Sequence, residues 1–314
     1  MDPAADTDPL VRTALSWYET HARDLPWRRP GTSAWAVLVS EIMLQQTPVT
    51  RVLPAFESWL ARWPTPGALA AEEPGEAVRA WARLGYPRRA LRLHAAAQAI
   101  AARHRGRVPS AYEDLIALPG VGEYTAAAVA SFAYQRRHVV LDTNVRRLLA
   151  RAVAGEAAAY ATPTTAERER AGRLVPADGP TAARWAVASM ELGALVCTSR
   201  TPQCASCPLR RSCAWRRAGY PPATRQPRRQ RYDGTDRQAR GRLLAVLRHS
   251  TAPVSAGELA ATWNDEVQRQ RALDGLVADG LVEPLSGDRY RLPAAKAFDD
   301  PVAMTTGSCD AARP

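Results

Sequence analysis

From about residue 8 to residue 218, apolar positions recur at the spacing of amphipathic helices, with short polar breaks and almost no strand-like alternation. Ser110 and Glu113 have the spacing of a capping box at one helix start. The pattern predicts an all-α domain. Its expected helices lie near residues 8–22, 34–46, 49–62, 74–83, 88–104, 111–117, 123–135, 145–153, 164–174 and 181–194.

A second pattern follows a segment rich in Pro, Gly and Arg, residues 219–236, whose composition argues against packing and predicts a linker. Beyond it we expect three helices and a β-hairpin, and Ser255 with Glu258 gives the second helix a capping box. The hairpin is LVEPLSGDRYRL, with SGD as its turn. The three helices are expected at 237–249, 255–263 and 265–279.

These elements predict a small winged-helix-like domain over residues 237–293. Residues 294–314 have the composition of a disordered tail. Length and a hydrophobic content of 46% in 314 residues are compatible with about two folded domains. The acidic start of the chain and the lack of any run of 18 apolar residues predict a soluble, cytoplasmic protein without a membrane partner.

The positive charge is concentrated in one segment. The net charge is +11, and between Cys197 and Arg242 there are twelve arginines but only two acids. Such a concentration is typical of a protein that binds a polyanion, because each arginine that neutralises a phosphate releases a counterion. A solvated basic linker is the alternative interpretation.

Lysine is almost absent from the chain. Of 42 basic residues, only Lys296 is a lysine, and it lies near the C-terminal end. Any mechanism that requires a lysine amine in the main domain is therefore excluded.

Four cysteines, Cys197, Cys204, Cys207 and Cys213, fall within 17 residues. Four thiolates this close together are suited to one metal centre, and their spacing does not separate a zinc site from a [4Fe–4S] cluster. Disulfides are the alternative, which the predicted cytoplasmic location and the unpaired Cys309 disfavour.

The sequence LPGVG, residues 118–122, lies between two predicted helices. Its Pro and Gly residues predict a tight hairpin whose backbone amides point outward at the start of the next helix, where they could bind a phosphate without reading sequence. A plain helix–helix turn is the alternative, and the basic excess favours DNA binding.

Two acids have unusual surroundings. Glu41 lies inside an apolar run, one helical turn before Gln45, and burial there would raise its pKa toward that of a general acid at neutral pH. Asp142 precedes a predicted helix, where it would act as an N-cap or remain ionised and face a developing cation. For Glu41 the alternative is a buried carboxyl bonded to a polar neighbour.

Seven motifs in order resemble the helix-hairpin-helix, Gly-Pro-Asp family of base-excision glycosylases, and most closely its MutY-type adenine glycosylases. The resemblance covers residues 8–218. The motifs are LPWR (25–28), SEIMLQQT (40–47), LGY (84–86), LPGVGEYTA (118–126), LDTNVRR (141–147), MELGA (190–194) and the four cysteines.

This resemblance implies a [4Fe–4S] cluster on the four cysteines, in a module made of residues 1–30 and 137–218, beside a six-helix module of residues 31–136. It also implies a monofunctional enzyme, because Tyr124 stands where the bifunctional relatives carry a catalytic lysine. The partner is double-stranded DNA with adenine opposite 8-oxoguanine or guanine. We expect a monomer, since the DNA surface must stay free.

The same resemblance assigns roles to single residues. Protonated Glu41 donates to adenine N7, and ionised Asp142, positioned by Asn144 and Tyr124, stabilises the sugar cation. Gln45 lies on the side of Glu41. Three further sets are implied: Trp27, Arg28 and Glu191 line the adenine pocket; Leu44, Gln46, Thr47, Leu84 and Tyr86 enter the base stack and touch the opposite base; and the amides of Gly120, Val121 and Gly122 hold the backbone.

The C-terminal region departs from the family, whose members usually end in a Nudix-like β-rich domain. The winged-helix-like domain expected here would add phosphate contacts or bind a partner protein, or serve as a packing module. Alternatives for the whole chain are a thymine or uracil mismatch glycosylase, an AP lyase of the same family, and a non-catalytic Fe–S DNA-binding regulator.

Overall fold

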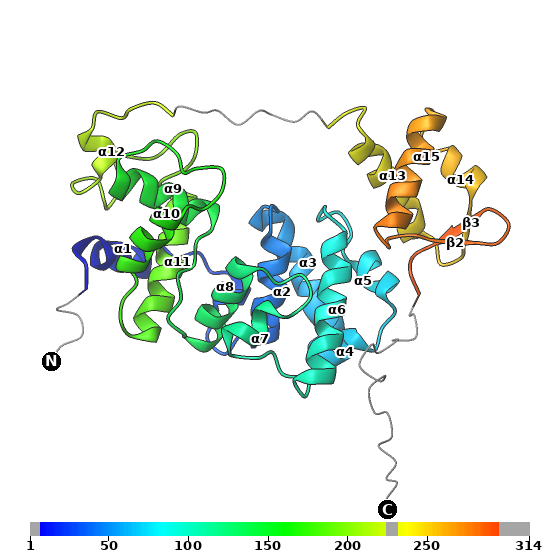
Figure 1. Cartoon of the computed structure of the whole chain (residues 1–314), viewed down its shortest axis with the longest axis horizontal. Helices are drawn as coiled ribbons and strands as arrows, with labels where there is room; N and C mark the ends of the chain where they lie inside the picture. Colours follow the sequence, from blue (N-terminus) through cyan, green and yellow to red (C-terminus); the bar gives the residue numbers. More distant parts are fainter. Residues whose placement is uncertain (1–6, 224–231, 295–314) are drawn as a thin grey trace, which may run out of the picture.

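The computed structural model describes residues 7–223 and 232–294. Up to residue 223 these residues form helices and turns (Figure 1), so the predicted all-α architecture is confirmed. The α-helices are α1 (Pro9–His21), α2 (Ala34–Leu44), α3 (Val49–Arg62), α4 (Pro66–Ala70), α5 (Pro74–Ala80), α6 (Arg88–Arg103), α7 (Tyr112–Ile116), α8 (Glu123–Tyr134), α9 (Thr143–Leu149), α10 (Thr165–Arg173), α11 (Gly179–Leu195) and α12 (Ala214–Arg217). A 3₁₀ turn, η1 (Pro26–Arg28), and a π-helical turn, η2 (Ala150–Ala154), complete this part.

Two predicted details are corrected. The short helices α4 and α12 were not anticipated, because five and four residues are too few to show a period. The capping box at Ser110 is wrong: α7 has Ala111 as its N-cap and no side-chain capping bond.

The six-helix module, α2–α8, is built around α2. Nine of the eleven residues of α2 are buried, because it is apolar on all sides and its neighbours α3, α6 and α8 enclose it. Trp59, Trp63 and Trp81 pack edge to face nearby, with ring centroids 4.6 and 5.5 Å apart. The position of Glu41 on α2 is therefore fixed by a densely packed core.

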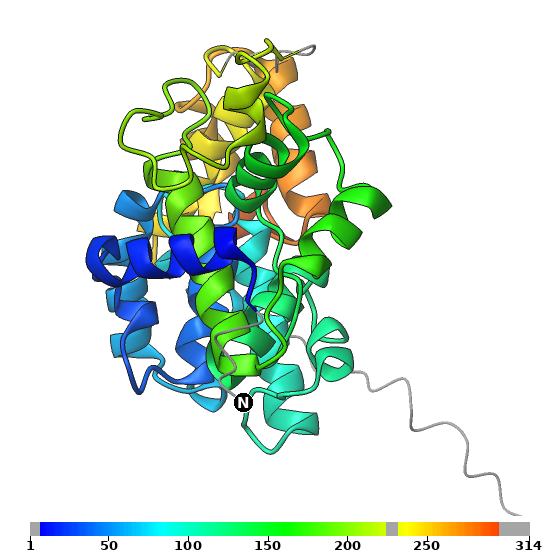
Figure 2. The same ribbon diagram turned by 90° about the vertical axis from the view of Figure 1, so that its left-hand side faces the viewer.

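The cluster module contains α1 and α9–α12. Its separate core includes Val11, Leu148, Trp185 and Leu192, and Figure 2 shows α1 lying across α11. Gly193 of α11 allows a close approach to α9, because a Cβ at this position would lie 2.6 Å from the backbone oxygen of Asn144. This contact sets the start of α9, where Asp142 lies.

The boundary between the modules differs from the prediction at one point. Leu25 and Trp27 belong to the core of the six-helix module, and the Trp27 ring packs edge-on against Phe56 with centroids 5.2 Å apart. The segment before residue 31 is therefore shared between the two modules.

The C-terminal domain has three helices, α13 (Asp236–His249), α14 (Ala256–Ala260) and α15 (Glu266–Ala278). Its three-stranded antiparallel sheet has the order β1 (Val254–Ser255), β3 (Arg289–Arg291), β2 (Glu283–Leu285). The hairpin was anticipated and the two-residue β1 was not. The capping box is present: Glu258 N donates to Ser255 Oγ at 3.2 Å, and Ser255 N donates to Glu258 Oε2 at 2.8 Å.

The C-terminal domain packs on the six-helix module. Leu243 and Leu292 belong to the same continuous core as the six-helix residues, and Gly75 N donates to Pro293 O at 2.8 Å. Residues 224–231 of the predicted linker and 295–314 of the predicted tail lie outside the described residues. Among the described helices, none is long and apolar enough to cross a membrane.

Candidate active site

Glu41 is a buried acid with a strongly altered pKa. Its side chain lies in the last part of α2 and is only 4% exposed. Burial raises its pKa from 4.5 to about 7, against the lowering effects of a Tyr124 hydrogen bond and the charge of Arg28, and the charge of Asp142 raises it further. Near neutral pH a large share of Glu41 is therefore protonated.

Asp142 has more hydrogen-bond donors around it than Glu41 has. It caps α9, accepting from Val145 N at 2.6 Å and from Asn144 Nδ2 at 2.7 Å. Burial raises the pKa of Asp142, and the net shift is upward although these hydrogen bonds and the charge of Arg147 act to lower it. The cap and the candidate charge-stabilising group are thus the same carboxylate.

Tyr124 of α8 joins the two acids electrostatically. Its hydroxyl is hydrogen-bonded to Glu41, and burial together with Glu41 and Asp142 raises its pKa well above 10.0. We expected Tyr124 to help position Asp142, but its hydrogen-bond partner is Glu41. A neutral phenol in this place can hold the Glu41 carboxyl but is not a nucleophile.

Glu191 of α11 is completely buried and both its oxygens are occupied. Arg23 Nε donates to Oε1 at 2.6 Å and Arg23 Nη2 to Oε2 at 2.8 Å, while Arg28 Nη1 donates to Oε2 at 2.6 Å. Burial raises the pKa of Glu191, but the two arginines outweigh it and the net shift is downward. Glu191 is therefore a counterion that holds Arg28, and its predicted role in lining the base pocket is corrected.

Arg89 of α6 links the two loops that were expected to enter the DNA. Its Nη1 donates to the carbonyl oxygens of Ile42, Met43 and Gln45 at 2.8, 2.9 and 2.6 Å. Its Nη2 donates to Thr47 Oγ1 and to the Gly85 carbonyl, both at 2.9 Å. Arg89 thus ties the end of α2 to residues 84–86.

This arrangement changes the set of side chains available to DNA. Thr47 and Leu84 are 6% and 3% exposed, so the prediction that their side chains enter the base stack is wrong: they line the site of Arg89. Gln46 and Tyr86 are exposed, and both have left-handed backbone angles, φ 56° and 46°. Leu44 is half-buried.

Gln45 points away from this surface. Its Nε2 donates to Thr125 Oγ1 of α8 at 3.2 Å. It therefore connects α2 to α8 on the same side as Tyr124, consistent with the predicted location near Glu41.

The hairpin between α7 and α8 carries amides at the surface. Val121 N donates to the Leu118 carbonyl at 3.1 Å, so its amide is not available to phosphate and that prediction is corrected. The amides of Gly120 and Gly122 have no backbone acceptor within the described residues. Gly120 has φ +76°, and a Cβ there would lie 2.6 Å from Arg92 Cβ, so the turn requires glycine.

The four cysteines are free thiols of intermediate exposure. Burial, together with the other three cysteines, raises the pKa of Cys207 to about 11, and Arg151 Nη1 donates to Cys197 Sγ at 3.6 Å. Within 7–223 and 232–294, no group of three or more ligand-type side chains has the geometry for a single metal ion. The charges of the four cysteine side chains act on one another, and four cysteines are the ligand set of a [4Fe–4S] cluster.

Comparison of the sequence with known proteins identifies the class of DNA repair enzymes to which this arrangement belongs. The model of the HhH-GPD superfamily, described as base excision DNA repair proteins, matches residues 39–175. The chain belongs to this superfamily. An adenine DNA glycosylase from Mycolicibacterium smegmatis is 54% identical over 279 residues, which cover 88% of this chain and 94% of that protein. The predicted membership of the MutY-type adenine glycosylases is confirmed.

Two other similar proteins each match about two thirds of this chain. The human adenine DNA glycosylase is 40% identical over 218 residues, 67% of this chain and 40% of that protein. A thermostable thymine-DNA glycosylase structure superposes with a TM-score of 0.59 at 26% identity, covering 67% of this chain and 95% of that one. The 279-residue match is too long to end before the C-terminal domain, so the mycobacterial relative shares that domain too.

Proposed function

We propose that this protein is a monofunctional glycosylase that releases adenine from DNA where adenine is opposite 8-oxoguanine or guanine. The observation that carries the proposal is Glu41, a buried acid whose pKa of about 7 keeps it available as a proton donor, within electrostatic reach of the capped carboxylate Asp142. The adenine glycosylases among the relatives support the choice of base.

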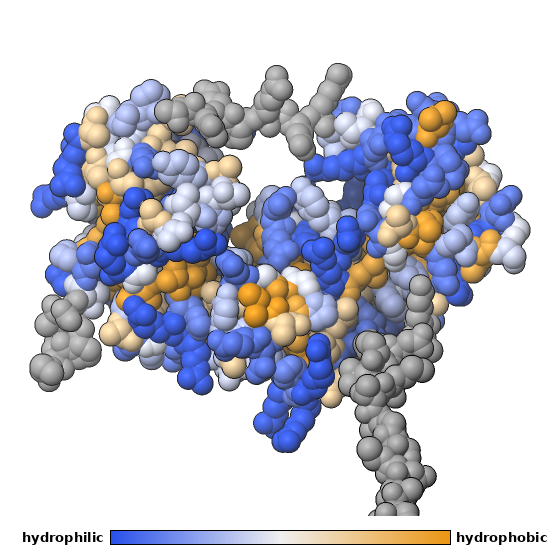
Figure 3. Space-filling view, in the orientation of Figure 1, coloured by the Kyte–Doolittle hydropathy of each residue, from blue (hydrophilic) through white to orange (hydrophobic). Residues whose placement is uncertain are grey.

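The proposed reaction uses the two carboxyls in opposite protonation states. The DNA backbone binds at the amides of Gly120 and Gly122, and adenine rotates out of the duplex toward α2. Figure 3 shows the surface hollowed between the cluster module and the six-helix module.

Glu41 then donates its proton to adenine N7, so that the base leaves neutral as the glycosidic bond breaks. Asp142 stabilises the positive charge that develops on the sugar, held in place by Val145 N and Asn144. Glu41, now a carboxylate, accepts the proton of the water that attacks the sugar carbon. Arg28, fixed by Glu191, lies close enough to influence the charge of Glu41.

Strand cleavage through a lysine Schiff base is not part of this mechanism. Tyr124 occupies the position where a lysine would be needed, and the chain's one lysine, Lys296, lies outside the described residues. Borohydride should therefore trap little or no covalent adduct with the DNA.

The four cysteines would hold a [4Fe–4S] cluster. Bound to them, such a cluster would cross-link the loop of residues 197–213 and would supply a redox-active centre there. Arg151 would hold this loop through its hydrogen bond to Cys197 Sγ. Arg147 would hold it through the Cys197 carbonyl, to which its Nε donates at 2.7 Å.

One panel of duplexes tests the proposed function. Base release is measured with adenine opposite 8-oxoguanine, adenine opposite guanine, thymine opposite guanine, and thymine glycol. We expect release from the two adenine duplexes alone. Release of thymine instead would favour the thymine glycosylase alternative, the activity of the similar solved structure. No release from any duplex would favour a DNA-binding regulator.

A further inference from the structure

An exposed cluster of two tyrosines and one arginine lies where the C-terminal domain meets the six-helix module. The guanidinium carbon of Arg237, in the first turn of α13, lies 5.6 Å from the ring centroid of Tyr86 and 5.4 Å from that of Tyr232. Tyr86 and Tyr232 are 48% and 47% exposed. The cluster thus brings together side chains from both domains at the surface.

The charge of Arg237 is available to a ligand. In the described part of the chain, its side chain has no ion pair and no hydrogen bond to another residue. Its neighbours differ: Arg240 pairs with Asp279, and Arg271 pairs with Asp236 at 2.6 Å. Two aromatic faces hold the planar guanidinium while leaving its N–H edges free, which is how arginine is presented to a phosphate.

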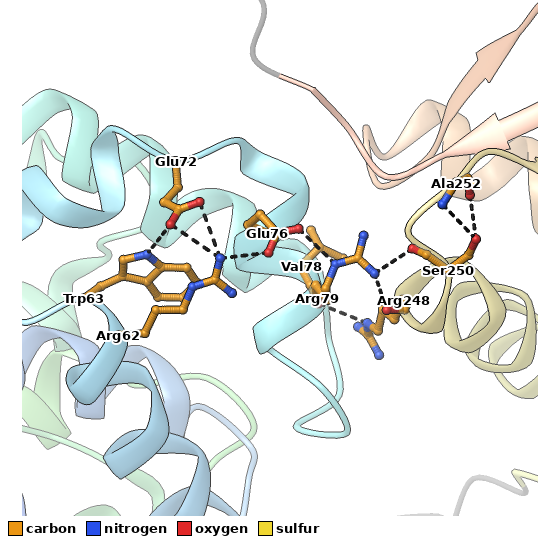
Figure 4. A network of polar contacts seen from close by, with 9 residues as sticks. All are labelled: Arg62, Trp63, Glu72, Glu76, Val78, Arg79, Arg248, Ser250 and Ala252. Atoms are coloured by element: carbon orange, nitrogen blue, oxygen red, sulfur yellow. Dashed lines mark hydrogen bonds and ion pairs between the residues drawn. The ribbon is translucent and has the colours of Figure 1, made fainter.

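The position of the cluster is fixed by a polar network across the domain boundary. Arg79 Nη1 donates to Ser250 O at 2.8 Å, and Arg248 Nε donates to Val78 O at 3.0 Å, so the two arginines cross the boundary in opposite directions (Figure 4). Glu76 holds Arg79 through Nε at 2.9 Å. The domain therefore has a defined place on α5.

One hydrogen bond across this domain boundary reaches the loop between α5 and α6, which carries Tyr86. Arg248 Nη1 donates to the Ala82 carbonyl at 2.5 Å, and Arg88 pairs with Asp279 at 3.1 Å. Arg89 holds the same loop from the other side, through Gly85 O at 2.9 Å. Tyr86 and Arg237 are thus held relative to each other before any ligand binds.

The helix α15 of this domain is poorly suited to binding a polyanion. The exposed face of α15 carries Glu266, Val267, Gln270 and Asp274, and its Arg271 is already paired. Over residues 232–294 the domain has nine acids and eight arginines. Phosphate binding through α15 would therefore meet about as much repulsion as attraction.

We propose that Arg237 binds a phosphate of the substrate DNA beside Tyr86, with Tyr232 holding the guanidinium, so that the C-terminal domain extends the DNA-binding surface through the start of α13. This inference rests on the proposed function, since it takes DNA as the ligand. Tyr86 contacts the opened duplex, and Arg237 fixes the neighbouring backbone in a charge-assisted contact.

The test measures DNA affinity in the full-length protein, with Glu41→Gln as the parent so that the substrate stays intact. The duplex carries adenine opposite 8-oxoguanine, and Kd is measured by fluorescence anisotropy at several NaCl concentrations. Arg237→Ala should weaken binding severalfold and reduce the slope of log Kd against log salt by about 1, the loss of one phosphate contact. Arg237→Lys should keep most of the slope.

Arg289→Ala is the matched control. Arg289 is an exposed arginine of the same domain, in the hairpin, and its removal should leave both affinity and slope unchanged. Equal Kd and slope for Arg237→Ala and its parent would overturn the inference, as would an effect of Arg289→Ala as large as that of Arg237→Ala. Matching thermal unfolding midpoints of parent and variants establish that folding is unaffected.

Failure of this inference is distinguishable from failure of the proposed function. Adenine release by the wild-type protein reports on the function alone. Release of adenine together with unchanged binding by Arg237→Ala overturns only the assignment of Arg237.

Discussion

Glu41 is a buried carboxyl and Asp142 a half-buried one, and the two differ in the number of hydrogen-bond donors around them. Glu41 lies on an apolar helix with Tyr124 as its hydrogen-bond partner, and its pKa rises to about 7. Asp142 lies at a helix N-terminus, where Val145 N and Asn144 Nδ2 bind its two oxygens. Burial raises the pKa of both acids, and at Asp142 the backbone and side-chain donors act against this rise and favour the ionised form.

Replacing Glu41, the acid on the apolar helix, should have the largest effect on adenine release. Glu41→Gln removes the proton donor while keeping the shape of the side chain, so single-turnover adenine release should fall by about 10² to 10⁴-fold. Binding of the same duplex, measured by anisotropy, should persist. Turnover close to that of the wild type would contradict the proton-donor role.

Replacing Asp142, the acid that caps α9, should have a somewhat smaller effect on adenine release. Asp142→Asn keeps a capping side chain but removes the charge opposite the sugar, and adenine release should fall by about 10² to 10³-fold. Asp178→Asn is the matched control, since Asp178 caps α11 through Thr181 N at 2.8 Å and is exposed. A similar loss of rate in both variants would reduce Asp142 to a structural cap.

Another buried acid, Glu191, extends the comparison because its partners carry full charges. Glu191→Gln leaves Arg23 and Arg28 without their counterion, and the free energy of unfolding should fall by about 3–5 kcal/mol. Urea unfolding measures this. Glu19→Gln, which breaks the exposed pair with Arg184, should change it by less than about 1 kcal/mol. Equal effects of the two changes would show that burial of the pair is unimportant.

Glu41→Gln should also stabilise the protein, and the gain should depend on pH. The folded-state pKa of about 7 lies above the ordinary 4.5, so the folded state keeps a proton that the unfolded state releases between these values. Stability therefore falls as pH rises from 4.5 to about 7 and then levels off. The stability advantage of Glu41→Gln should be absent near pH 4 and reach up to about 3 kcal/mol at pH 8.

This dependence is measured by urea unfolding of both proteins at each pH. A stability difference that does not change between pH 4 and pH 8 would show that the pKa of Glu41 is ordinary in the folded protein.

Local sequence predicted the helices, the burial of Glu41 and the capping position of Asp142, because each depends on neighbours within a few residues. It missed Arg23, whose partner Glu191 is 168 residues away. Nothing adjacent to Arg23 distinguishes it from other arginines. The sequence around Glu191 was the one indication that a basic partner is needed, since a buried carboxylate requires a hydrogen-bond donor.

The predicted DNA contacts were less accurate because a motif shows which residues recur and not which atoms point outward. Thr47 was expected at the surface, but its hydroxyl accepts from Arg89 at 2.9 Å. The Val121 amide was expected to bind phosphate, but the tight turn uses it internally. Both errors arise from long-range or turn-specific hydrogen bonds that a helical period does not contain.

The most direct test of the account is the pH dependence of single-turnover adenine release by the wild-type protein, from pH 5 to pH 9. If Glu41 acts as the acid with a pKa near 7, the rate should fall about tenfold for each pH unit above that value. Glu41→Gln should lack this dependence. A wild-type rate that stays constant or rises between pH 7 and pH 9 would contradict the assignment of Glu41 as the proton donor.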